Sequence, residues 1–131
     1  MSYYFAADLN QDFDSAIETV TAALKDEGFG IISEIDIKDK LKEKLDVDFR
    51  RYRILGACNP PYAHKALTIE DKIGTMLPCN VIVQEKDGGG TEVAAINPLE
   101  SMKAVNNPDL LALAQEVTDR LKKVIEKLKS A

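Results

Sequence analysis

The feature that most restricts the fold is a run of three glycines between two segments rich in β-branched residues. The segments are residues 77–85 and 91–96, and Lys86-Asp87-Gly88-Gly89-Gly90 joins them. Asp-Gly followed by further glycines supplies the positive φ angles that a hairpin turn needs, so at least this pair of strands is antiparallel. The run lacks the Gly-Lys-Ser/Thr ending of a phosphate-binding loop, and no helix follows it directly.

Helices and strands are predicted to alternate along the rest of the chain. The last helix is the clearest, because one apolar stripe follows the Asn107-Pro108-Asp109 start signal at helical spacing. An earlier helix begins at Asn10 or Asp12 and ends at Gly28, where a residue without Cβ suits a left-handed terminus. Strands are expected at 3–7, 30–35 and 51–57, a short helix from Asp36 to 45, partial helix at 62–73, and a helical turn after Pro98.

This order of elements favours an α+β fold. We expect an antiparallel or mixed sheet of about five strands, with two long helices on one face. Leu, Ile, Val and Phe make up about 27% of the chain, above the roughly 20% below which disorder is expected. No linker divides the sequence, so residues 1–131 are expected to form a single α+β domain. The uncovered face of the sheet would meet either solvent or the sheet of a second copy.

The charge distribution argues against nucleic acid and membrane partners. The chain has a formal net charge of −5, whereas binding to phosphates needs a basic face. One segment, Lys38–Arg53, has seven basic and four acidic residues, but the alternating signs indicate a solvated helix and its exit loop. No apolar run approaches the ~18 residues of a membrane span, and the first residues do not resemble a signal peptide, so a cytoplasmic location is expected.

Cys58 and Cys79 are the residues most suggestive of chemistry, because each lies at the end of a predicted strand. If the two strands are antiparallel, both thiols lie at the same edge of the sheet; if they are parallel, the thiols lie at opposite edges. Two thiolates, with His64 a turn later, would suit zinc or copper(I), although the spacing matches no standard zinc motif. Buried packing residues, a redox pair and a single reactive thiol are the other interpretations.

The remaining polar residues carry weaker signals. His64 is the only histidine and lies in a polar stretch, where a surface position is the ordinary outcome. Asn59 precedes Pro60-Pro61, and asparagine before proline suits turn geometry without requiring a ligand. No pair of acidic residues is surrounded by apolar neighbours that would raise a carboxyl pKa, so general acid–base catalysis has no candidate.

Several of these motifs together resemble a known family. They are Gly28-Phe29-Gly30, Tyr52-Arg53-Ile54-Leu55-Gly56-Ala57-Cys58-Asn59-Pro60, Leu77-Pro78-Cys79-Asn80-Val81 and Asn97-Pro98. In this order and spacing they resemble domain-of-unknown-function family 302 over nearly the whole chain. The resemblance implies a curved, mainly antiparallel sheet with helices packed against it, similar to the TATA-binding-protein fold, and a tendency to dimerise. No DNA-binding activity follows from that fold. It also implies that Cys58 and Cys79 are the motif cysteines, which strengthens a metal or redox role beside the interpretation as buried packing residues, whereas the motif does not ask for histidine at His64.

The first functional hypothesis is a non-enzymatic binding module that forms a cytoplasmic homodimer. Its pocket would lie near Cys58, Asn59, Pro60, Pro78 and Cys79, and would bind a small molecule or a soft metal, zinc or copper, with His64 as a further candidate ligand. One alternative is a thiol-based redox or transfer enzyme, in which one cysteine attacks and the other resolves. The other alternative is a protein-interaction domain that uses its exposed sheet face.

Overall fold

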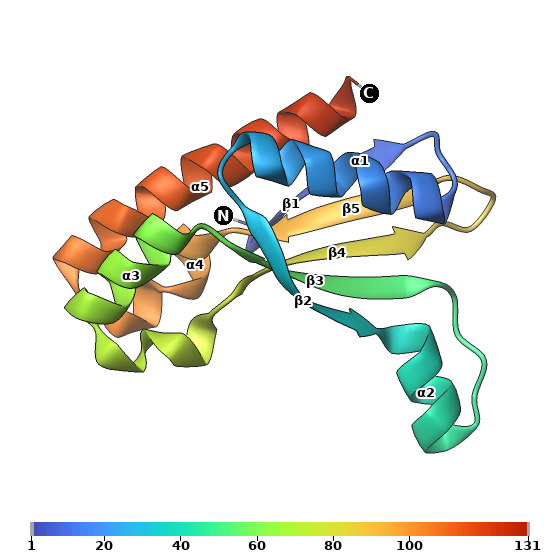
Figure 1. The fold of residues 1–131 in the computed structure, drawn as a ribbon, viewed down its shortest axis with the longest axis horizontal. Coiled ribbons are helices and arrows are strands. Elements are labelled where there is room, and N and C mark those ends of the chain that lie inside the picture. The colour runs from blue at the N-terminus through green and yellow to red at the C-terminus, as the bar shows by residue number, and fades with distance from the viewer. Residues whose placement is uncertain (1, 131) are drawn as a thin grey trace.

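The computed structural model describes residues 2–130 as an α+β fold built on one five-stranded sheet (Figure 1). The strand order is β1-β5-β4-β3-β2, and every neighbouring pair is antiparallel. The expected fold class is therefore confirmed, including the hairpin, which joins β4 and β5 through the glycines. The strands are β1 (Tyr4–Leu9), β2 (Gly30–Asp36), β3 (Tyr52–Cys58), β4 (Cys79–Glu85) and β5 (Thr91–Ile96).

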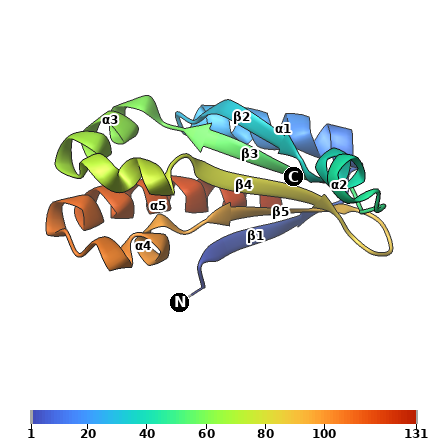
Figure 2. The same ribbon diagram turned by 90° about the horizontal axis from the view of Figure 1, so that it is seen from below.

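Two long helices, α1 (Phe13–Asp26) and α5 (Pro108–Lys129), cover one face of the sheet (Figures 1 and 2). Each begins with the predicted cap: Asp12 accepts a hydrogen bond from the Ser15 N–H, and Asn107 accepts from the N–H groups of Asp109 and Leu110. Gly28 follows α1 with a φ of 88°, the left-handed conformation expected there. The apolar stripes of both helices thus meet the apolar side of the sheet, and within residues 2–130 neither long helix covers the opposite side.

Shorter helices lie at the two ends of the sheet. At one end are α3 (Pro60–Ile69), the 3₁₀ helix η1 (Asp71–Met76), α4 (Pro98–Ser101) and the 3₁₀ helix η2 (Lys103–Val105). These elements pack on the first turns of α5 and form a second apolar cluster, which includes Ile73, Met102 and Leu110. The region expected to be partly helical at 62–73 is therefore two helices.

Helix α2 (Ile37–Leu45) projects from the other end of the sheet (Figure 1). Its Asp36 cap is present as predicted, but no residue of the helix is buried, and 65% of Leu45 is exposed. The apolar side chains of Ile37, Leu41 and Leu45 thus have little to pack against among residues 2–130.

Gly56 in β3 lies where Ser33 of β2 and Pro78, just before β4, leave no room for a side chain. A Cβ atom at Gly56 would collide with Ser33 Oγ and come within 2.7 Å of Pro78 Cγ. The proline ring cannot rotate away, so the backbone would have to shift. Gly30, in the adjacent strand, offers a matched position, because a Cβ there meets no atom within 4 Å.

We therefore expect Gly56→Ala to lower the free energy of unfolding by about 1–3 kcal/mol, the range of overpacked sites. Gly30→Ala should change it by no more than about 0.5 kcal/mol. Urea unfolding of both variants measures the difference. Adding Ser33→Gly to Gly56→Ala should restore part of the loss, and equal effects of the two single variants would contradict the crowding at Gly56.

Candidate functional site

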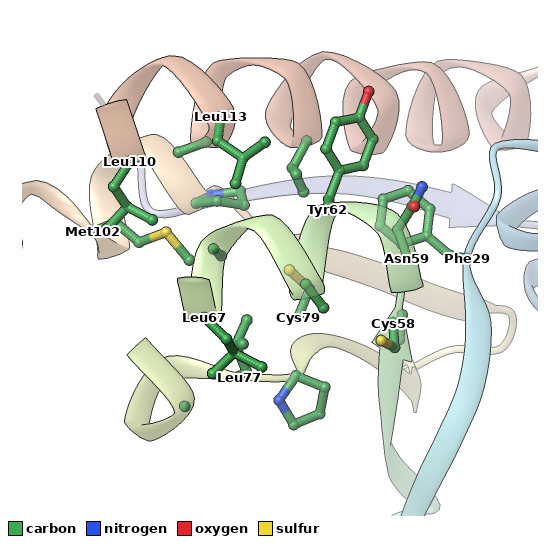
Figure 3. A pocket seen from close by; sticks show the side chains of 18 of the residues that line it. Phe29, Cys58, Asn59, Tyr62, Leu67, Leu77, Cys79, Met102, Leu110 and Leu113 are labelled. Atoms are coloured by element: carbon green, nitrogen blue, oxygen red, sulfur yellow. The ribbon is translucent and has the colours of Figure 1, made fainter. Parts of the chain in front are cut away.

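A cavity of about 350 Å³ lies where the sheet, α3, η1, α4 and α5 meet (Figure 3). It is located between the two apolar clusters of the fold, because Phe29 and Cys79 belong to the first and Met102 and Leu110 to the second. The lining is apolar almost throughout: Phe29, Ile32, Ala57, Cys58, Asn59, Tyr62, Ala63, Ala66, Leu67, Gly74, Leu77, Pro78, Cys79, Pro98, Met102, Leu110, Leu113, Ala114 and Val117.

The antiparallel pairing of β3 with β4 brings both cysteines to one edge of the sheet. Ala57 lies opposite Cys79 in the register, and Cys58 is the next residue along β3. Of the two arrangements that the sequence left open, the structure has the one that places the thiols at the same edge. Both cysteines are free, and both line the cavity.

The pleat of the strands gives the two thiols different environments. Cys79 shares the helix-covered face with Ala57 and is buried, whereas Cys58 alternates with Ala57 and is half-buried. Burial raises the pKa of the Cys79 thiol from 9.0 to about 11, with a further contribution from the nearby Cys58. Cys79 is therefore a poor nucleophile near neutral pH, because the thiolate is the reactive form.

Alkylation should distinguish the two cysteines. In the folded protein at about pH 8, we expect iodoacetamide to modify Cys58 while Cys79 stays unmodified, because its raised pKa lowers the thiolate fraction by roughly 100-fold. Peptide mass spectrometry measures the modification, with urea-unfolded protein as the control in which both react. Equal labelling of the two in the folded state would contradict the burial of Cys79.

The same raised pKa predicts a loss of stability at high pH. Between about pH 9 and 11 the unfolded chain loses the Cys79 proton while the folded protein keeps it, so the free energy of unfolding falls by about 2–3 kcal/mol. The stability difference between the wild-type protein and Cys79→Ala, followed by urea unfolding, should shrink across this range. A constant difference would show that the folded-state pKa of Cys79 is not raised.

The structure places the other predicted site residues in two groups. Asn59 and Pro78 line the cavity beside the cysteines, whereas Pro60 and His64 are absent from its lining. His64 lies exposed on α3.

Within residues 2–130 no three His, Cys, Asp or Glu side chains are placed to hold a metal ion together. Two thiols alone do not fit a tetrahedral zinc site, which takes four ligands.

Most of the cavity is built by residues that the sequence indicated only as core. Leu110, Leu113 and Val117 belong to the apolar stripe of α5, and nothing in the stripe separates cavity residues from packed ones. Ile32 enters the lining through a break in register, because β2 shifts against β3 between Ile31 and Ser33. Such bulges re-aim side chains next to functional sites. Ile32 is 64% exposed, so it marks the mouth of the cavity.

A polar cluster beside the cavity ties three helices together. Arg120 of α5 donates from Nε to the hydroxyl of Tyr62 on α3 at 3.2 Å, and from Nη1 to the carbonyl oxygen of Glu27 at 3.4 Å. The guanidinium also lies 5.5 Å from the centre of the Tyr62 ring. These contacts hold α3 against α5 and the end of α1, which keeps the cavity walls in place.

Comparison with known proteins identifies the family. A family model described as domain of unknown function DUF302 matches residues 5–128. The crystal structure of an uncharacterized conserved protein DUF302 from Bacillus stearothermophilus has 28% sequence identity and a TM-score of 0.89, covering 98% of this chain and 99% of that one. Among curated proteins no match is found. No helix in residues 2–130 is both long and apolar enough to cross a membrane. This chain belongs to the DUF302 family.

Proposed function

We propose that the protein binds a small, largely apolar molecule in the cavity beside Cys58 and Cys79. The observation that carries this proposal is a cavity of about 350 Å³ whose lining contains almost no polar side chains. Ligand sites typically span ~300–1,000 Å³ and combine apolar walls with a few polar groups. The volume is at the lower end of that range, so the ligand is small.

The mouth of the cavity supports the same proposal. Ile32 and Leu67 line it and are 64% and 44% exposed. Large apolar side chains gathered at an opening lose contact with water when a ligand covers them, and each covered Å² contributes roughly 25 cal/mol. An apolar ligand would therefore gain from both the interior and the mouth.

Binding without catalysis fits the composition of this lining. In the described part of the chain, no Asp, Glu, Lys, Arg or His side chain lines the cavity, so the side chains that most often act as general acid or base are missing from it. The thiol-enzyme alternative has less support, because the pKa of Cys79 is raised to about 11 and no histidine lies beside Cys58 in the lining.

The proposal is tested by titrating the protein with para-propyltoluene while following thermal unfolding. A ligand that binds only the folded state at 100 times its Kd adds about 2.7 kcal/mol to the free energy of unfolding. We expect the melting temperature to rise with probe concentration and to saturate. An unchanged melting temperature over the soluble range of the probe would contradict the proposal. Native mass spectra with added zinc and a copper(I) donor test the soft-metal alternative in the same protein.

We also propose that the uncovered face of the sheet joins a second copy. Half-buried Ile54, Ile82 and Ala94 lie on this face, and 44% of Ile35 is exposed beside them. Helix α2 projects on the same side (Figure 1). The segment Lys38–Arg53 around it has a net charge of +3, which leaves −8 on the rest of a chain whose total is −5. A basic arm and an acidic body are complementary between two copies.

Native mass spectrometry tests the homodimer. We expect the wild-type protein to be a dimer and Ile82→Glu to be a monomer with an unchanged circular dichroism spectrum, because a charge at the centre of the shared face would be buried unpaired. Thr21→Glu, on the exposed side of α1, is the matched control and should remain dimeric. A wild-type protein with the mass of one chain would contradict this proposal.

A further inference from the structure

Asn59 is the most buried polar side chain in the cavity lining. It is 9% exposed and lies between the end of β3 and the start of α3 (Figure 3). Its Nδ2 donates to the carbonyl oxygen of Glu27 at 3.4 Å. Among residues 2–130, no hydrogen bond reaches its Oδ1, so a nine-tenths buried amide keeps one acceptor without a protein partner.

Two other asparagines show which hydrogen bond Asn59 lacks. Asn97 and Asn107 each precede a proline at the start of a helix, as Asn59 does. Oδ1 of Asn97 accepts from the N–H of Leu99, and Oδ1 of Asn107 accepts from the N–H of Asp109, in both cases the second residue of the helix. The second residue of α3 is Pro61, which has no N–H to donate.

The end of α1 fixes which way the Asn59 amide points. Gly28 passes so close that a Cβ there would come within 2.9 Å of Asn59 Nδ2. The hydrogen bond to the carbonyl oxygen of Glu27 therefore holds Nδ2 against the turn that ends α1, and Gly28 permits this close approach because it has no Cβ. Oδ1, on the other branch of the amide, is turned away from that contact and stays available in a residue that lines the cavity.

We propose that Asn59 Oδ1 accepts a hydrogen bond from a hydroxyl or N–H group of the ligand. This inference rests on the proposed function and narrows its ligand class to uncharged molecules with an apolar body and one hydrogen-bond donor. A charged group is excluded from the interior, because no charged side chain of residues 2–130 lines the cavity to pair with it. Oδ1 is not among the fully buried unpaired atoms, so it keeps contact with water until a ligand covers it. An acceptor that loses its water without gaining a partner is costly, so a ligand that supplies a donor gains over one of the same shape that does not.

The test compares two probes of nearly the same shape, para-propylphenol and para-propyltoluene, by isothermal titration calorimetry. We expect the wild-type protein to bind the phenol about 3–10-fold more tightly, the ratio that one neutral hydrogen bond gives. Asn59→Leu should lose the preference for the phenol while still binding the hydrocarbon, because the phenol hydroxyl would then enter the cavity without a partner. Equal affinities in the wild-type protein, or a preference that survives in Asn59→Leu, would overturn the inference.

A second variant tests the inference without changing Asn59. Pro61→Ala restores a backbone N–H at the second residue of α3, the position that donates to Asn97 and Asn107 in their helices. Asn59 Oδ1 can then cap α3, and the preference for the phenol should fall. Pro60→Ala is the matched control, because it restores an N–H one residue too early, and it should keep the preference. An unchanged preference in Pro61→Ala would count against the inference. If neither probe binds the wild-type protein, the proposed function itself fails, and this inference fails with it.

Discussion

Phe29→Ala is expected to lower the free energy of unfolding by about 3–5 kcal/mol, the usual cost of removing a buried aromatic ring. Phe29 is 2% exposed and belongs to the cluster between the sheet and its two long helices. Its N–H donates to the carbonyl oxygen of Leu24 at 2.9 Å, which fixes the residue at the exit of α1. Because the backbone is held there, the neighbours cannot easily close over the space that the ring leaves.

Urea unfolding measures this loss, with an unchanged dependence on urea concentration as evidence that the folded state is intact. Ile32→Ala is the matched control, because Ile32 also lines the cavity but is 64% exposed. It should change stability by no more than about 0.5 kcal/mol. Similar losses in the two variants would contradict the position of Phe29 in the core. A domain with a total stability of ~5–15 kcal/mol would lose a large share of it through Phe29→Ala.

Ala63→Trp is expected to abolish binding of para-propyltoluene or to weaken it by at least about tenfold, a loss of ~1.4 kcal/mol. Ala63 is half-buried on α3 and lines the cavity, so an indole at this position would occupy the space of the ligand. Since the cavity holds about 350 Å³, the added ring can enter it without displacing the core. Calorimetric titration of the folded variant measures the affinity.

Lys65→Trp is the control for Ala63→Trp. Lys65 is exposed on the same helix and is absent from the cavity lining, so the same bulky side chain should leave the affinity unchanged. Thermal unfolding of both variants checks that they are folded. If Ala63→Trp binds the probe as tightly as the wild-type protein does, the ligand lies somewhere other than this cavity. If both variants lose binding, the effect does not come from filling the cavity.

Local patterns in the sequence were sufficient for most of the secondary structure, although the segment 62–73 is two helices instead of one partial helix. Caps such as Asp12 and Asn107 act on the nearest backbone N–H groups, and apolar periodicity reports only which side of a helix or strand is buried. The hairpin through Gly88 depends on turn geometry over a few residues. These interactions span short stretches of chain, so the sequence shows them directly. The sequence Asn59-Pro60-Pro61 likewise removes the N–H of the second helical residue, but that Oδ1 finds no other partner among residues 2–130 is decided by the fold.

The site itself depended on contacts between distant segments. The sequence could not decide between two placements of Cys58 and Cys79, because strand direction follows from how the whole sheet assembles. It marked Cys58, Asn59, Pro78 and Cys79, which line the cavity, together with Pro60 and His64, which do not. A residue one helical turn beyond a cavity residue can face either the cavity or solvent. Only the packing of the other elements against the helix decides which.

The sequence by itself thus determined which segments are helices and strands, most of their ends to within a few residues, and which of their faces are apolar. Only the tertiary structure decided that the apolar faces of α3, α5 and the sheet leave a cavity where they meet. Leu110 and Leu113 carry the same periodic signal as the fully packed Leu121 and Ile125 of the same helix. In both cases the periodic signal reflects only that the side chains are buried. Whether an empty volume remains beside them depends on the shapes of several elements packed together.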